Sequence, residues 1–146
     1  MTDIVQDEII EEFSVFDEWM DKYEYIIELA DGLPLIDQSL RTDEYVIRGC
    51  QSKVWVAASY SDGKVHFTAD SNAIITKGLI ALLIRVMDDL TPDEIISKDL
   101  YFIDAIGLGN NLSPTRSNGL RSMIDQMRRY ARTFKTGENN NGTDSK

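Results

Sequence analysis

The segment AIITKGLIALLIRVM, residues 73–87, constrains the fold of this chain most strongly. Its apolar side chains fall on nearly every side of a helix, and such a helix has to be covered on more than one flank. Gly78 stands in its middle, where glycine costs about 1 kcal/mol relative to Ala unless another backbone approaches closely. The sequence therefore predicts a helix that packs across a sheet and is covered again on its other side.

Strand-like segments precede this helix. Residues 45–48 and 53–60 are rich in Val, Tyr and Trp, and residues 64–70 alternate between apolar and polar side chains. The Asp-Gly pair between the last two segments is a strong hairpin signal, and short connections favour antiparallel pairing. We therefore expect a small three-stranded antiparallel sheet, with His66 on the polar face of its last strand.

Helical patterns lie on both sides of the strands. Residues 9–30 carry an apolar stripe at helical spacing, which fits one helix or two because Ser14 and Asp17 are both good N-caps. Start and stop signals predict further helices after Thr91-Pro92, over residues 99–106, and after Ser113-Pro114 with a core-facing stripe of Leu120, Ile124, Met127, Ala131 and Phe134. Helices that cover a small antiparallel sheet make an α+β fold.

The length and composition of the chain are those of one soluble domain, with 146 residues of which 42% are hydrophobic. We expect a single domain over residues 1–135 and a disordered tail over residues 136–146, where little apolar surface can be buried. No apolar run approaches the roughly 20 residues of a membrane helix, and the acidic N-terminus does not resemble an export signal. A cytoplasmic protein without a membrane partner is expected, either a monomer or a homodimer.

The chain has one cysteine, Cys50, and one histidine, His66. These two residues can form neither an internal disulfide nor a zinc or iron–sulfur site within one chain, and we expect no bound cofactor. A net charge of −10 opposes binding to nucleic acid. Basic residues near the end of the chain suit either an acidic partner or the negative end of a helix; they are Arg116, Arg121, Arg128, Arg129, Arg132 and Lys135.

Cys50 lies in the stretch RGCQSKVWV, in a polar turn at the mouth of a strand, whereas free cysteines are more often buried. Arg48 and Lys53 favour its thiolate and apolar shelter would oppose it, so the sequence leaves its reactivity open. A Cys/His hydrolase needs a histidine base, and His66 is predicted to face solvent. One sulfur is enough, however, to receive a sulfur atom and pass it on.

The stretch RGCQSKVWV resembles the cysteine loop of the SufE family of sulfur acceptors, whose signature is Gly-Cys-Gln-Ser followed by a Val-Trp strand. The stretches YEYIIELADGLP, ADSNAIITKGLIALLI and LSPTRSNGLRSMI resemble other segments of that family in the same order. The resemblance runs with few gaps from about Trp19 to Tyr130. Several motifs in order are more specific than any one of them, and they imply the SufE-like α+β fold.

This resemblance implies a role in iron–sulfur cluster assembly. Cys50 would take sulfur from the persulfide of a SufS-like cysteine desulfurase, which uses pyridoxal phosphate, and pass it to a SufBCD-like scaffold. Such a protein is a sulfur carrier and desulfurase activator rather than a stand-alone enzyme. The family tucks this side chain against an apolar hollow, so the loop has to open or rotate when the desulfurase docks.

The resemblance also implies roles for four other residues. Gly49 would be the hinge of the loop, and Gln51 a hydrogen-bonding neighbour of Cys50. Arg116 would place a positive charge near the persulfide anion, or else form a structural salt bridge. Asp70 would influence the cysteine loop, or else cap the following helix.

Three other functions stay open at this point. The chain could serve a paralogous desulfurase system, because the motifs do not separate the two systems. An iron–sulfur scaffold has a related fold, but it holds its cluster with several cysteines and this chain has one. A non-catalytic adaptor would carry Cys50 without using it.

Overall fold

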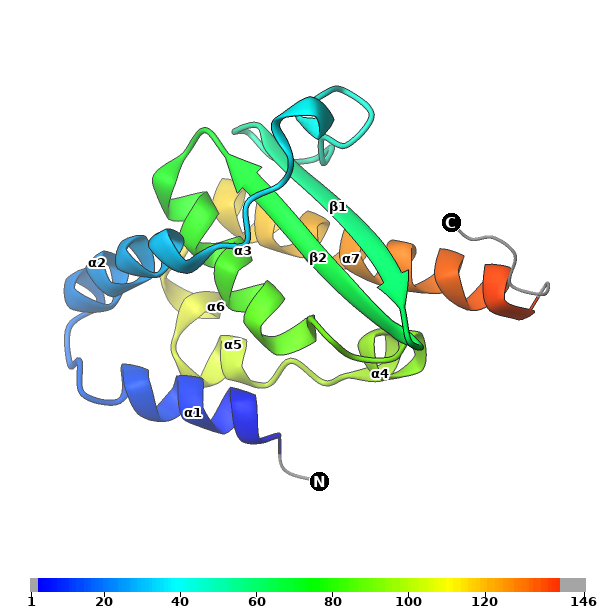
Figure 1. Ribbon diagram of the computed structural model, residues 1–146. Helices are drawn as coiled ribbons and strands as arrows, with labels where there is room; N and C mark the ends of the chain where they lie inside the picture. Colours follow the sequence, from blue (N-terminus) through cyan, green and yellow to red (C-terminus); the bar gives the residue numbers. More distant parts are fainter. Residues whose placement is uncertain (1–2, 140–146) are drawn as a thin grey trace.

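The computed structural model describes residues 3–139, which form an α+β fold. One antiparallel hairpin lies against a layer of helices (Figure 1). The elements in chain order are α1 (Ile4–Phe13), α2 (Trp19–Leu29), the 3-10 turns η1 (Ala30–Gly32) and η2 (Gln38–Leu40), β1 (Val54–Ser61), β2 (Lys64–Ser71), α3 (Ile74–Met87), α4 (Pro92–Ser97), α5 (Phe102–Ala105), α6 (Leu108–Asn111) and α7 (Pro114–Asn139).

The hairpin forms at the predicted Asp-Gly pair. β1 and β2 pair along their whole length, in a register that sets Ser61 opposite Lys64. Asp62 and Gly63 have φ of 54° and 79°, the positive values that a tight two-residue turn requires. His66 lies on the polar face of β2 as predicted, with 38% of its side chain exposed.

The expected third strand is wrong, because within residues 3–139 the sheet has two strands. Residues 45–48 make only an isolated bridge, between Val46 and Trp55. Turns at residues 43–45 and 48–49 leave too few extended residues between them for a ladder. The strand-like composition of this segment has another cause, since Val46 packs against Trp55 in a small cluster outside the main core. Composition alone does not separate a strand from a short extended segment.

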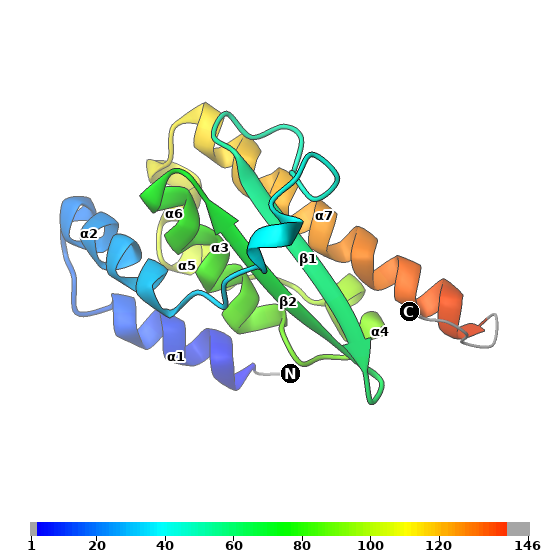
Figure 2. The same cartoon turned by 45° about the horizontal axis from the view of Figure 1, so that its top comes forward.

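Helix α3 is the buried centre of the molecule. It packs against β2, α7, α1 and α2, so neighbours cover it on several sides (Figure 2). An ideal Cβ at Gly78 would lie 2.1 Å from the backbone oxygen of Ile26 in α2. The close backbone approach that the sequence required at Gly78 is therefore confirmed, and it explains how this helix tolerates a central glycine.

Residues 9–30 form two helices, α1 and α2, which settles the alternative left open by the sequence. Ser14 is the C-cap of α1, and α2 begins after Glu18 without a side-chain cap. Neither Ser14 nor Asp17 therefore starts α2. The break lets both helices pack on α3 from different directions.

The segment between α3 and α7 consists of short helices. Thr91 and Glu94 form the predicted capping box at the start of α4. The helix expected over residues 99–106 is shorter, spanning α5 alone, and Gly107 ends it with φ of 90°. Helix α6 follows directly and was not anticipated, because four residues carry too little periodicity to signal a helix.

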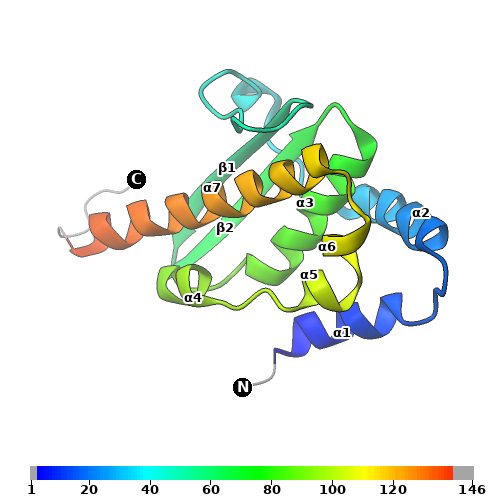
Figure 3. The same cartoon turned by 180° about the vertical axis from the view of Figure 1, so that it is seen from behind.

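The last helix, α7, runs along the back of the hairpin (Figure 3). In its predicted stripe Leu120, Met127 and Ala131 are buried and Ile124 and Phe134 are half-buried. The helix continues to Asn139, past the expected domain boundary at residue 135; the remainder of the expected tail, 140–146, lies outside the described residues. Within residues 3–139 no helix is long and apolar enough to cross a membrane.

Candidate functional site

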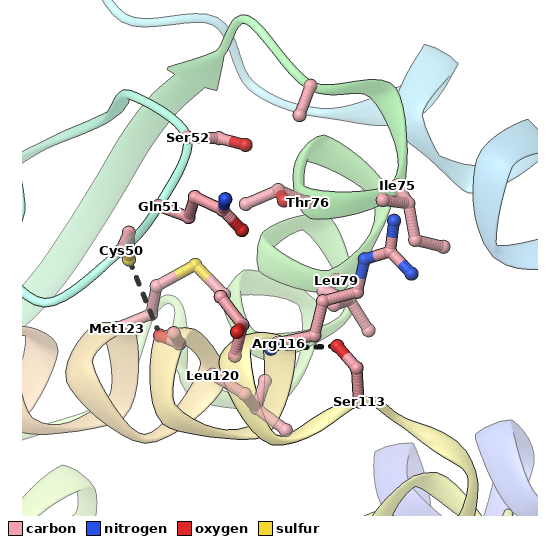
Figure 4. Close-up of a pocket in the computed structure, with 13 residues that line it drawn as sticks. Cys50, Gln51, Ser52, Ile75, Thr76, Leu79, Ser113, Arg116, Leu120 and Met123 are labelled. Carbon is pink, nitrogen blue, oxygen red and sulfur yellow. Dashed lines mark hydrogen bonds between the residues drawn. The ribbon is translucent and has the colours of Figure 1, made fainter.

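The cysteine loop lies between the bridging segment at Val46 and strand β1, and it rests on the beginning of α7. Cys50 is half-buried, and its thiol donates a hydrogen bond to the backbone oxygen of Gly119, with Sγ and O 3.6 Å apart (Figure 4). The two residues are 69 positions apart in the sequence. Packing of α7 across the hairpin therefore creates the environment of the thiol.

The thiol borders a pocket of about 240 Å³ between the cysteine loop, the start of α3 and the start of α7. Polar and apolar side chains share its wall, so the space suits a small group that is partly shielded from water. The lining residues are Cys50, Gln51 and Ser52 from the loop, Ala73, Ile75, Thr76 and Leu79 from the α3 side, and Ser113, Thr115, Arg116, Gly119, Leu120 and Met123 from the α7 side.

Gly49 gives the loop its conformation. Its φ is 94°, in the left-handed region that side chains disfavour. An ideal Cβ at Gly49 would also lie 2.4 Å from the Ser122 Oγ of α7. The backbone angle therefore favours glycine at this position, and a side chain there would also have to displace the Ser122 hydroxyl.

Burial raises the pKa of the Cys50 thiol above its usual value of 9.0. From the sequence, the cations at Arg48 and Lys53 would lower the pKa of the thiol and apolar shelter would raise it. In the structure the effect of shelter is the larger one. Both cations belong to exposed side chains, where water screens their charge. The resting thiol is therefore protonated near neutral pH and is a weak nucleophile until its surroundings change.

Gln51 and Arg116 line the same pocket as Cys50. Figure 4 shows the guanidinium of Arg116 extending toward the first turn of α3, and it lies over the Tyr23 ring at 5.7 Å from the ring centroid. Within residues 3–139 no carboxylate forms a salt bridge with Arg116. The structural salt bridge considered for Arg116 is therefore absent among the described residues, and the exposed Arg116 side chain lines the pocket.

Asp70 lies apart from the residues that line the pocket. Its carboxylate forms ion pairs with Arg41 and Lys77, each at 3.5 Å. It does not cap α3, whose N-cap is Ala73 without a side-chain hydrogen bond, so the capping role expected for Asp70 is wrong. Asp70 instead joins the end of β2 to α3 and to the segment that precedes the cysteine loop.

Sequence reasoning missed the contribution of α7 beyond Arg116. Gly119 accepts the thiol hydrogen bond, Ser122 contacts Gly49, and Met123 closes the pocket beside Cys50. The spacing of residues 116, 119, 120 and 123 places them on one face of a helix, and that periodicity was a usable signal. What the periodicity does not reveal is that this face meets the cysteine loop.

The chemistry available here is that of a single thiol beside a small pocket. In the described part of the chain no group of three or more His, Cys, Asp or Glu residues could hold a metal ion. The arrangement suits a reaction that forms and breaks one bond at sulfur.

Comparisons with known proteins agree with the fold and the loop. Residues 7–131 match the SufE family model, described as a Fe-S metabolism associated domain, and this match begins upstream of the resemblance seen in the sequence. An uncharacterized SufE-like protein of Rhizobium etli is 39% identical over 131 residues, covering 86% of this chain and 88% of that protein. The solution structure of a hypothetical protein from Thermus thermophilus has a similar fold, with a TM-score of 0.73 and 19% identity over 91% of this chain and 97% of that one. The family match spans both walls of the pocket as well as the cysteine loop, and the chain therefore belongs to the SufE family, a family of iron–sulfur metabolism.

Proposed function

We propose that Cys50 is the sulfur-accepting residue of this protein and that its donor is the persulfide of a cysteine desulfurase. The Cys50 thiolate attacks the outer sulfur of that persulfide. A new S–S bond forms at Cys50, and the bond between the outer sulfur and the desulfurase cysteine breaks, leaving that cysteine as a thiolate. The exchange conserves electrons, so it needs no further oxidant. Transfer to a thiol of an iron–sulfur scaffold repeats the same step.

The observation that carries this proposal is the position of the only cysteine, at the mouth of a pocket and on a loop with a glycine hinge. Since burial raises the pKa of the thiol, docking has to move the loop before Cys50 reacts. Gly49 supplies the backbone freedom for that movement. The resting position slows reaction of the half-buried thiol with other reactants.

Arg116 and Gln51 support the loaded state in this proposal. A persulfide is more acidic than a thiol and is an anion near neutral pH, so a cation that lacks a carboxylate partner is a suitable neighbour. Arg116 is exposed, as Arg48 and Lys53 are, but it lines the pocket itself and has no such partner among the described residues. Gln51 provides an amide that donates to the anion. Asp70 acts indirectly, because it holds Arg41 at the start of the segment leading to the loop.

The test is the intact mass of the protein after incubation with candidate desulfurases, free cysteine and pyridoxal phosphate. We expect a gain of one sulfur atom on wild type that disappears on reduction, and no gain on Cys50→Ser. The serine variant should also lose stimulation of the desulfurase while still binding it, because serine keeps a hydroxyl donor for Gly119 and so preserves the resting loop. Ser59→Ala, an exposed position on β1, is the matched control and should behave as wild type.

The outcomes separate the alternatives. A desulfurase that loads the protein identifies the donor system, whether the SufS-like one or its paralogue. Stimulation that is unchanged in Cys50→Ser would favour an adaptor, and an absorbing cluster formed with iron and sulfide would favour a scaffold. A protein that never gains sulfur from any donor contradicts the proposal. We place the exchange in the cytoplasm, where a reducing environment keeps a lone thiol free.

A further inference from the structure

Gly119 lies inside a long helix without the usual reasons for being a glycine. Positive φ among the described glycines occurs at Gly49, Gly63 and Gly107, and Gly119 is outside that set. An ideal Cβ at Gly119 would meet one neighbour, Cys50 Sγ at 3.6 Å, which is an ordinary van der Waals distance. Alanine would therefore fit the unloaded protein, and it is the better helix former.

The methyl group of an alanine at position 119 would fit less well beside a loaded Cys50, that is, one that carries a second sulfur atom. A second sulfur is bonded to Sγ at about 2.05 Å, at the atom that otherwise carries the proton. The added Cβ would lie 3.6 Å from Sγ. If the S–S bond of about 2.05 Å points within about 70° of the direction from Sγ to this Cβ, the outer sulfur lies closer to the Cβ than Sγ does. A side chain at position 119 thus occupies space that the outer sulfur atom of a persulfide needs and that the thiol does not.

The carbonyl of Gly119 distinguishes the two states as well. It accepts a hydrogen bond from the unloaded thiol, and a persulfide has no proton on Sγ to donate. The outer sulfur would replace that proton and approach the carbonyl oxygen too closely. Loading therefore breaks this contact, and the side chain has to turn into the adjoining pocket beside Gly119 and Met123.

We propose that Gly119 is a specificity-determining residue for sulfur loading: its missing side chain leaves room for the second sulfur atom on Cys50. The inference rests on the proposed function and deepens it. Gly119 acts on the state of Cys50 and takes no part in bond making. Glycine accommodates both the thiol and the persulfide, whereas a side chain at position 119 would accommodate the thiol alone.

The experiment compares Gly119→Ala with wild type and with Asn118→Ala, whose exposed neighbouring position on α7 gives a similar gain in helix propensity away from the thiol. Each protein is loaded in two ways, by a desulfurase with free cysteine and by sodium polysulfide. In the second reaction the Cys50 thiolate attacks the terminal sulfur of the polysulfide, a new S–S bond forms at Cys50, and the shortened polysulfide anion leaves. The loaded fraction is measured by intact mass, and the melting temperature of each unloaded protein is recorded.

We expect Gly119→Ala to melt no lower than wild type and to hold about fivefold less persulfide, or less still, at equal polysulfide concentration, because it overpacks the loaded state only. Asn118→Ala should load as wild type does. Equal loading of Gly119→Ala and wild type would overturn the inference, and so would a clearly lower melting temperature, since glycine would then be required by the fold.

The two loading reactions separate this inference from the proposed function. If polysulfide loads wild type but no desulfurase does, the proposed donor is wrong, and the loading of Gly119→Ala by polysulfide still tests the glycine. If a desulfurase loads both proteins equally, the proposed function stands and the inference about Gly119 fails. If neither reagent loads wild type, both are overturned.

Discussion

Two buried glycines, Gly78 in α3 and Gly119 in α7, meet different neighbours. A side chain at Gly78 would collide with the backbone of Ile26, whereas one at Gly119 would only touch the Cys50 thiol. Backbone cannot move aside without shifting a whole helix, but a thiol on a loop with a glycine hinge can. The contact between α2 and α3 is therefore fixed by backbone atoms. The contact between α7 and the cysteine loop involves a side chain that can move.

The largest expected effect on stability is that of Gly78→Ala. Its Cβ would sit 2.1 Å from the Ile26 oxygen, so α2 and α3 have to separate. We expect the free energy of unfolding to fall by about 3 kcal/mol, at the upper end of typical overpacking costs. Urea unfolding measures the loss, with Gly32→Ala as the control because nothing lies within 4 Å of its Cβ. A variant within about 0.5 kcal/mol of wild type would show that the two helices are not held by this contact.

Gly49→Ala should have an intermediate effect. It forces a side chain into the left-handed region at φ of 94° and against Ser122, so we expect a loss of about 1–2 kcal/mol in the free energy of unfolding. Adding Ser122→Ala removes the contact with Oγ but not the backbone strain, so the double variant should recover part of the loss. Full recovery would mean that the backbone angle is unimportant.

Gly119→Ala should change stability in the opposite direction. Because the added methyl only touches the thiol, the gain in helix propensity should show as an increase of up to about 1 kcal/mol in the free energy of unfolding. The same urea unfolding experiment measures it. A loss as large as that of Gly78→Ala would place both glycines in one class and remove the contrast between the two regions.

The smallest expected effect is a pH dependence of stability from Cys50. Burial raises the pKa of its thiol in the folded state, so between the unfolded and folded pKa values the folded protein binds more protons. Stability that is present below the unfolded pKa is therefore lost as pH rises past about 9 toward the folded value. Wild type should lose slightly more stability than Cys50→Ser over this range, by an amount reduced by the partial exposure of the thiol. Parallel pH profiles for the two proteins would contradict this.

Much of the fold could be predicted because its signals are local. The Asp-Gly turn, the capping box at Thr91 and the all-apolar pattern of α3 lie within a few neighbouring residues, and each produced the expected element. The prediction of a third strand was wrong because the strand-like residues near Val46 serve to pack against Trp55 and do not form a strand. The number of residues available between two turns decided the outcome there.

The candidate site was predictable in part. Cys50, Gln51 and Arg116 meet in one pocket, and Gly49 has the strained angle that a hinge glycine allows. Asp70 stands apart from it, and Gly119, Ser122 and Met123 were not anticipated. Residues of the loop and of α7 are far apart along the chain, so no local pattern indicates which of them come into contact.

The sequence by itself determined the hairpin, the central helix, the requirement for a close contact at Gly78, and the restriction of sulfur chemistry to one cysteine. Only the tertiary structure decided that the thiol is sheltered, that its pKa is raised, and that Gly119 is its neighbour. The physical reason is the range of the interactions. Turn and helix signals act between residues a few positions apart, whereas desolvation of a thiol depends on whatever surface the folded chain brings over it.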